Sequence, residues 1–171
     1  MRTSNALPIL ITLMLQLSAC SIISKEIRDE AEPPVAFKTL LEHVDTYIGK
    51  TVILGGYILE VQNRPGRTLI SVLQTPLTFQ DYPTSSARSE GNFLVAHEDF
   101  LDPRVFKTDS KITLAGRVIG LADEQLETCP NPCLFLESRE IYIKREIEYD
   151  PNHTTDAYDF DDWTSSWERP Y

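Results

Sequence analysis

The chain has 171 residues, enough for one domain of ordinary size. It carries 16 basic and 26 acidic residues, which gives a formal net charge of −10. A charge of this sign repels the phosphate backbone of nucleic acids, so we expect no nucleic-acid partner.

The N-terminus has the pattern of a secretory signal. Arg2 precedes an apolar run over residues 6–17, and the small residues Ser18 and Ala19 follow. The run is too short to cross a bilayer, which takes about 20 apolar residues. The next residue is Cys20, and the sequence Leu-Ser-Ala-Cys resembles the lipobox of bacterial lipoproteins.

This resemblance implies that residues 1–19 are a cleaved signal peptide and that Cys20 becomes the lipid attachment site. Acyl chains stabilise membrane binding by about 0.8 kcal/mol per buried methylene, and two or more chains anchor firmly. We therefore expect a membrane partner through the anchor. Lipoprotein sorting, as the resemblance implies, reads residue 21, where an aspartate favours the inner membrane and here there is Ser21. The expected location is the outer membrane, facing the periplasm. The alternatives are a secreted protein with an incidental cysteine and an uncleaved membrane helix.

The mature chain divides by composition into three parts. Residues 20–34 are charged and end in Pro33-Pro34, which is typical of a lipid-anchored spacer. Residues 35–148 contain the periodic apolar segments and are expected to form a β-barrel domain. Residues 149–171 are acidic and aromatic, with few aliphatic residues, which predicts disorder. The alternative for this tail is a segment that docks on a partner or on the barrel.

The β-barrel domain begins with one helix. Apolar residues recur at spacings of three or four from Phe37 to Ile48, and Gly49 stands where such a helix would end. Residues 52–58 and 112–118 then alternate as strands, and each carries an inward glycine, Gly56 and Gly116. Because glycine inside a strand marks a bend, the two segments predict a small closed barrel.

The remaining strands are expected over residues 68–74, 92–96 and 134–144. Residues 76–91 are rich in proline, serine and charge, which predicts an exposed loop. Asp102 and Pro103 occupy N-cap and first-turn positions, which predicts a short helix before the fourth strand. The expected fold is mainly β: a small OB-like barrel of five or six strands with one or two short helices.

The barrel segment also contains an ordered set of short motifs. They are Tyr47-Ile48-Gly49-Lys50, Gly55-Gly56-x-Ile58, Val61-x-Asn63, Val72-Leu73-Gln74-x-Pro76-Leu77, Ser89-x-Gly91-x-Phe93-Leu94, Phe100-Leu101-Asp102-Pro103 and Ile112-Thr113-Leu114-x-Gly116-x-Val118-x-Gly120. Together with the lipobox they are similar to the Slp family of outer-membrane lipoproteins, from Cys20 to about residue 121. This resemblance implies an outer-membrane address and a starvation or stationary-phase context, and it implies no established enzymatic reaction.

Two cysteines lie close together in the mature chain. Cys129 and Cys133 flank Pro-Asn-Pro, and the periplasm is oxidising, which favours a local disulfide. The closed loop is short, so its stabilisation should be less than the roughly 3 kcal/mol of a 15-residue loop. A free or partner-linked pair and a metal or redox site are the alternatives, although zinc would need two further ligands.

His97-Glu98-Asp99 is the cluster that most resembles a metal or acid–base site. Adjacent residues of an extended segment point to opposite faces, so we interpret it as a solvated strand end. The sequence has no nucleophile elbow, phosphate loop or zinc-protease motif. We therefore expect no enzyme, no catalytic or metal site and no cofactor.

These features favour an outer-membrane lipoprotein with a periplasm-facing barrel and a structural or accessory role in the envelope, with a link to stress or starvation. An envelope protein is the expected partner if the tail docks. The alternative is a module that binds a small molecule or glycan. Such a module requires a cleft beside the barrel mouth, with aromatic side chains and paired polar groups.

Substituting Cys20→Ser should abolish incorporation of radioactive fatty acid and leave an unprocessed precursor, because only a thiol at this position forms the thioether. Metabolic labelling followed by gel electrophoresis measures both. Unchanged labelling would contradict the assignment of Cys20 as the anchor.

Overall fold

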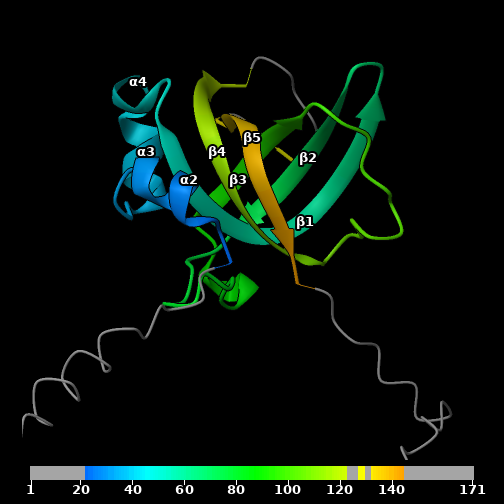
Figure 1. Cartoon of the computed structure of the whole chain (residues 1–171), viewed down its shortest axis with the longest axis horizontal. Helices are drawn as coiled ribbons and strands as arrows, with labels where there is room; N and C mark the ends of the chain where they lie inside the picture. The colour runs from blue at the N-terminus through cyan, green and yellow to red at the C-terminus, as the bar shows by residue number, and fades with distance from the viewer. Residues whose placement is uncertain (1–21, 123–126, 130–131, 145–171) are drawn as a thin grey trace, which may run out of the picture.

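A computed structural model describes residues 22–122, 127–129 and 132–144, and its centre is a closed five-stranded barrel (Figure 1). The strands follow the order β1-β2-β3-β5-β4 around the barrel. This confirms the predicted mainly-β, OB-like fold. The strands are β1 (Thr51–Arg64), β2 (Arg67–Gln74), β3 (Gly91–His97), β4 (Lys111–Leu121) and β5 (Leu134–Ile143).

The long strand β1 pairs with two different strands along its length. Its first half, residues 51–57, pairs with β4, and its second half, residues 56–64, pairs with β2. All pairs are antiparallel except β3 with β5. The two repeated segments of the sequence lie side by side, since Leu54 faces Leu114 and Gly56 faces Ile112.

The inward glycines allow close approach of neighbouring backbones. A Cβ at Gly56 would lie 1.9 Å from the carbonyl oxygen of Leu73, and a Cβ at Gly116 would lie 3.2 Å from that of Glu137. The first distance is far inside van der Waals contact, so β1 and β2 can pair at this point only because residue 56 has no side chain.

Within the described residues, three short α-helices precede the barrel: α2 (Lys25–Glu30), α3 (Phe37–Glu42) and α4 (Val44–Tyr47). The predicted helix over 37–48 is thus divided in two at His43, whose φ of −126° and ψ of 33° are not helical. Phe37 and Leu40 of α3 are buried in the core, and the Phe37 ring lies 6.0 Å from that of Phe93. The helix pair therefore covers one part of the barrel with apolar side chains.

The short helix predicted after Asp102 is absent, and residues 102–106 form a single turn. The Asp102 side chain accepts a hydrogen bond from the backbone N–H of Arg104 (2.9 Å), as a capping residue would. Only one turn follows, because Asp109 has a positive φ of 66° and the chain enters β4 at Lys111. Local capping chemistry is present, but too few residues remain to extend a helix.

The predicted spacer also differs from the structure. Residues 25–30 form α2, and Ile23 is buried with 1% of its surface exposed. The backbone N–H of Glu32 donates a hydrogen bond to the carbonyl of Thr51 (2.8 Å). Residues 22–34 are therefore part of the folded domain. Among the residues that the structure describes, no helix is long and apolar enough to cross a membrane.

Substituting Gly56→Ala should lower the free energy of unfolding by about 3 kcal/mol, since a methyl group would press against the Leu73 backbone. Gly116→Ala is the matched control and should cost clearly less, because its contacts begin at 3.2 Å. Urea unfolding followed by circular dichroism measures both. Equal losses for the two variants would contradict the close approach at Gly56.

Candidate functional site

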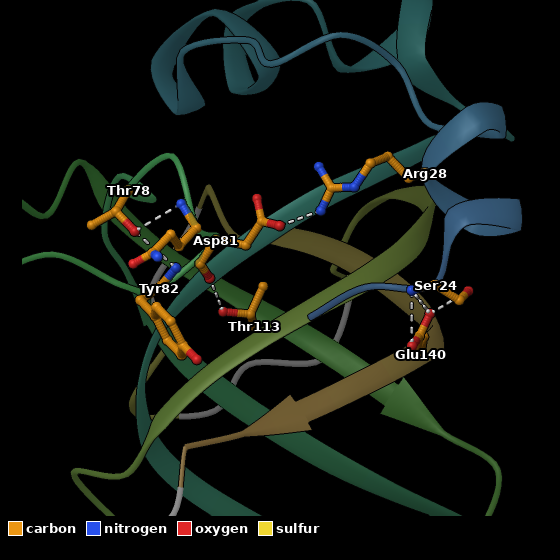
Figure 2. Close-up of polar contacts among 8 residues, drawn as sticks. Ser24, Arg28, Thr78, Asp81, Tyr82, Thr113 and Glu140 are labelled. Carbon is orange, nitrogen blue, oxygen red and sulfur yellow. Dashed lines mark hydrogen bonds and ion pairs between the residues drawn. The ribbon is translucent and has the colours of Figure 1, made fainter. Parts of the chain in front are cut away.

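The N-terminal segment, residues 22–34, is fastened to the barrel by polar contacts. The backbone N–H of Ser24 donates to both carboxylate oxygens of Glu140 on β5 (3.2 and 3.0 Å), and the Ser24 hydroxyl donates to one of them (2.8 Å). One helical turn further on, Arg28 forms an ion pair with Asp81 (Figure 2). These contacts tie the N-terminal segment to β5 and to the loop that carries Asp81.

Asp81 belongs to the loop that joins β2 to β3, residues 75–90. The Thr78 hydroxyl accepts hydrogen bonds from the backbone N–H groups of Gln80 (3.3 Å) and Tyr82 (3.2 Å), which closes a tight turn (Figure 2). Asp81 lies in this turn with a positive φ of 63°. The Thr113 hydroxyl of β4 donates to the Asp81 carbonyl (2.6 Å), so the turn is fixed to the barrel.

The loop rests on β1 at Gly55. A Cβ at this residue would lie 2.5 Å from Cδ2 of Leu77 and 3.3 Å from Cγ of Pro83. The Tyr57 hydroxyl donates to the carbonyl of Thr84 (2.9 Å), which adds a polar contact beside the apolar one. The predicted exposed loop is therefore only partly exposed: Phe79 has 94% of its surface in solvent, whereas Pro83 is buried.

A cleft of about 570 Å³ lies between the N-terminal segment, β1 and this loop. Its lining is mostly apolar, and the Arg28–Asp81 ion pair supplies charge on one side. Thr75 is fully buried, and its Oγ1 has no hydrogen-bond partner within the described part of the chain. The apolar lining residues are Ala31, Pro33, Pro34, Val35, Ala36, Phe37, Val52, Ile53, Leu54, Gly55, Pro76 and Leu77.

This cleft suits a small amphipathic molecule better than a chemical reaction. Binding sites for small molecules are concave and mainly apolar, with a few polar groups that fix the orientation. Phe37 supplies an aromatic side chain, and the Arg28–Asp81 pair supplies the paired polar groups. The cleft thus has part of what the alternative interpretation of the sequence, a small-molecule or glycan-binding module, requires, because it is concave and has paired polar groups, but Phe37 has only 1% of its surface exposed.

A second hollow of about 530 Å³ is lined by charged residues of opposite sign. Lys50 lies 3.4 Å from Glu32, Arg117 pairs with Glu137, and Arg139 pairs with Glu30. Each pair is partly exposed, so water screens it and its contribution to stability is small. The charges balance within the hollow, which gives it no preference for an anion or a cation.

The structure brings Cys129 and Cys133 together as a disulfide, with Cα atoms 5.7 Å apart. Both residues are buried and pack with Leu69 and Leu94 in a second apolar cluster. The disulfide thus packs against β2 and β3 through Leu69 and Leu94. Cys20 lies outside the described residues, as does the tail 149–171.

His97, Glu98 and Asp99 do not form a site in the structure. His97 is half-buried, and its Nδ1 is 2.7 Å from the Ser138 hydroxyl, whereas Glu98 and Asp99 are exposed. No group of three metal-ligating side chains occurs within residues 22–122, 127–129 and 132–144. The interpretation of this cluster as a strand end agrees with these positions.

Shifted pKa values do not mark a catalytic centre in the described ranges. The Arg104 guanidinium and backbone N–H lower the pKa of Asp102, but this pair lies on the surface. A hydrogen bond with Tyr82, together with burial, raises the pKa of Tyr142 above its ordinary value, and Lys144 opposes the shift. A raised phenol pKa keeps Tyr142 neutral and protonated, as in any structural tyrosine.

Sequence reasoning missed the N-terminal side of the cleft. The charged composition of residues 25–32 suggested a solvated linker. The available signal was the spacing of Ile23 and Ile27, which is one helical turn and places both on one face. The ion pair between Arg28 and Asp81 joins residues 53 positions apart and has no local sequence signal.

These observations define a small barrel protein with an N-terminal segment packed on its surface and a lipobox-like sequence directly before that segment. A family model described as the outer membrane lipoprotein Slp family matches residues 17–171. The chain belongs to this family, as its motifs indicated.

A relative in Escherichia coli (strain K12), described as the uncharacterized lipoprotein YeaY, is 27% identical over 120 residues. The alignment covers 70% of this chain and 62% of that protein.

Two solved structures that match part of this chain are distant in sequence. A putative aspartyl-tRNA synthetase from Leishmania major Friedlin has a TM-score of 0.42 and 9% identity, over 81% of this chain and 26% of the other. The OBody AM3L09, solved bound to hen egg-white lysozyme, has a TM-score of 0.39 and 13% identity, over 59% of this chain and 87% of the other.

Substituting Ala36→Trp should weaken binding of the fluorescent amphiphile anilinonaphthalene sulfonate about tenfold, or about 1.4 kcal/mol, by filling the cleft from an exposed position. Thr39→Trp, also exposed on α3 but outside the lining, is the control and should leave the affinity unchanged. Fluorescence titration gives the dissociation constants. Equal affinities for all three proteins would exclude the cleft as the binding site.

Proposed function

We propose that this protein is acylated at Cys20 and holds its barrel at the periplasmic face of the outer membrane, as an accessory or structural component of the envelope. The observation that carries the proposal is the extent of the family match. It begins at residue 17 and runs to residue 171, so it includes the lipobox-like residues together with the barrel. The lipobox-like residues and the barrel are thus matched by the same family model.

The contacts of the N-terminal segment support a tethering role. Ile23 is buried and Ser24 is bound to Glu140, so the folded domain begins three residues after Cys20. A domain that begins so close to an acylated residue is held at the membrane rather than released into the periplasm. A starvation or stationary-phase context, which the family resemblance implies, is part of the proposal.

The role is proposed to be non-catalytic. Among the ionisable side chains that line the cleft, Arg28 pairs with Asp81 and Glu32 lies 3.4 Å from Lys50. Glu90 accepts a hydrogen bond from the backbone N–H of Lys38 (3.2 Å), so no nucleophile stands beside a base in this lining. The tail 149–171 is proposed as the segment that meets an envelope protein partner, because its aromatic residues alternate with acids.

A second candidate function is the binding of a small amphipathic molecule in the cleft. The specific observation in its favour is the combination of an apolar lining with the Thr75 hydroxyl, which is buried without a partner in the described chain. The two candidates are compatible, since a tethered envelope protein can also carry a ligand.

The location can be tested by density-gradient separation of membranes from exponential and stationary-phase cells, combined with protease treatment. The protein should sediment with the outer membrane, be more abundant in stationary phase, and resist protease until the outer membrane is permeabilised. The matched variant Ser21→Asp should move to the inner-membrane fraction. Digestion in intact cells, or an inner-membrane position for the unaltered chain, would contradict the proposed location.

A further inference from the structure

The anchor and the barrel are separated by a very short stretch of chain. Two residues, Ser21 and Ile22, lie between Cys20 and the buried Ile23. Extended chain spans at most about 3.6 Å per residue, so the Cα atoms of Cys20 and Ile23 are no more than about 11 Å apart. If Cys20 is acylated as proposed above, the surface around Ile23 must lie at the level of the lipid headgroups.

Next to Ile23, the surface of the barrel continues along β5. Ser24 is bound to Glu140, and because alternate residues of a strand share a face, Tyr142 lies on the same outer face. The Tyr142 ring meets the ring of Tyr82 edge-on, with centroids 6.3 Å apart. The Lys144 ammonium lies 5.0 Å from the centroid of the Tyr82 ring.

The start of β4 continues this surface. The backbone N–H of Lys144 donates to the carbonyl of Lys111 (3.0 Å), and the Lys111 ammonium lies 5.8 Å from the Tyr57 ring centroid. Tyr57 in turn is bound to the loop at Thr84. In Figure 1 the start of α2, the loop and the end of β5 all lie along the lower side of the barrel.

Phe79 projects from the same loop. It is 94% exposed, and it follows Thr78, whose hydroxyl holds the turn that carries Asp81 and Tyr82. Two acidic groups beside this surface are already engaged, since Asp81 pairs with Arg28 and Glu140 accepts a hydrogen bond from Ser24, whereas Glu26 and Asp29 of α2 are exposed. Away from α2, the surface presents tyrosines, lysines and the protruding Phe79.

Tyrosine and lysine side chains together with an exposed apolar residue suit the boundary between lipid and water. Aromatic rings sit at the headgroup level, and lysines extend their ammonium groups to the phosphates while their stems cover apolar surface. The short tether brings this same side of the domain to that boundary, so position and chemistry agree.

We propose that the barrel lies against the phospholipid leaflet with this leaflet-facing surface (Phe79, Tyr82, Lys111, Tyr142 and Lys144), and that Phe79 inserts among the headgroups. The proposal rests on acylation of Cys20. It leaves the β1–β2 hairpin, which rises on the upper side in Figure 1, directed toward the periplasm.

The test measures how deeply a fluorescent probe at residue 79 enters the bilayer of vesicles made of phosphatidylethanolamine and phosphatidylglycerol. The acylated full chain carries Phe79→Cys, labelled with a nitrobenzoxadiazole thiol reagent. Cys20 is blocked by lipid and Cys129 is joined to Cys133, so residue 79 holds the one reactive thiol. Lipids with bromine near the headgroup should quench this probe several-fold more than a probe at Pro65→Cys, an exposed residue of the hairpin.

The outcomes separate the two proposals. Co-sedimentation with vesicles and equal, weak quenching at residues 79 and 65 would leave the anchor standing and overturn the leaflet-facing surface. Failure to co-sediment would overturn both proposals. A chain that ends at Glu148, and so lacks the acidic tail 149–171, tests whether the tail covers this surface instead of lipid. Strong quenching at residue 79 only in that shortened chain would show that the tail covers the surface, and would overturn the proposal for the whole protein.

Discussion

The close approach of β1 and β2 at Gly56 is the constraint on which the barrel depends. β1 is hydrogen-bonded to β4 along its first half and to β2 along its second half, and Gly56 is paired with both Ile112 and Gln74. One strand can serve both neighbours only if it bends strongly, and the bend brings the Leu73 carbonyl to a place that any Cβ would occupy. Closure of the sheet follows from this bend, and the positions of the outer elements follow from the closure.

The adjacent residue, Gly55, allows close packing on the outer side of the same strand. Gly55 leaves room for Leu77 and Pro83, so the loop between β2 and β3 lies on the barrel instead of projecting into solvent. The docked loop places Asp81 where Arg28 of α2 can reach it. Two consecutive glycines therefore set the inner curvature of the barrel and the outer wall of the cleft.

The strands were predictable because alternation of apolar residues reflects the two faces of a sheet, and the matching patterns of residues 52–58 and 112–118 belong to two strands that pair side by side. The disulfide followed from two nearby cysteines and an oxidising compartment. The cleft was not predictable, because its walls meet through contacts such as Arg28 with Asp81 that join distant residues. The false helix at Asp102 had a correct local cap, but the tertiary path of the chain into β4 stopped it after one turn.

The bonds between Ser24 and Glu140 join the first folded residues to the last strand of the described domain. Any pull exerted through the N-terminus is therefore transferred directly to β5, which is itself hydrogen-bonded to β3 on one side and β4 on the other. Because β5 is hydrogen-bonded on both sides, a force applied to it is distributed over β3 and β4 before β5 can separate from the barrel. A force applied at the N-terminal end would thus be borne by β3, β5 and β4 together.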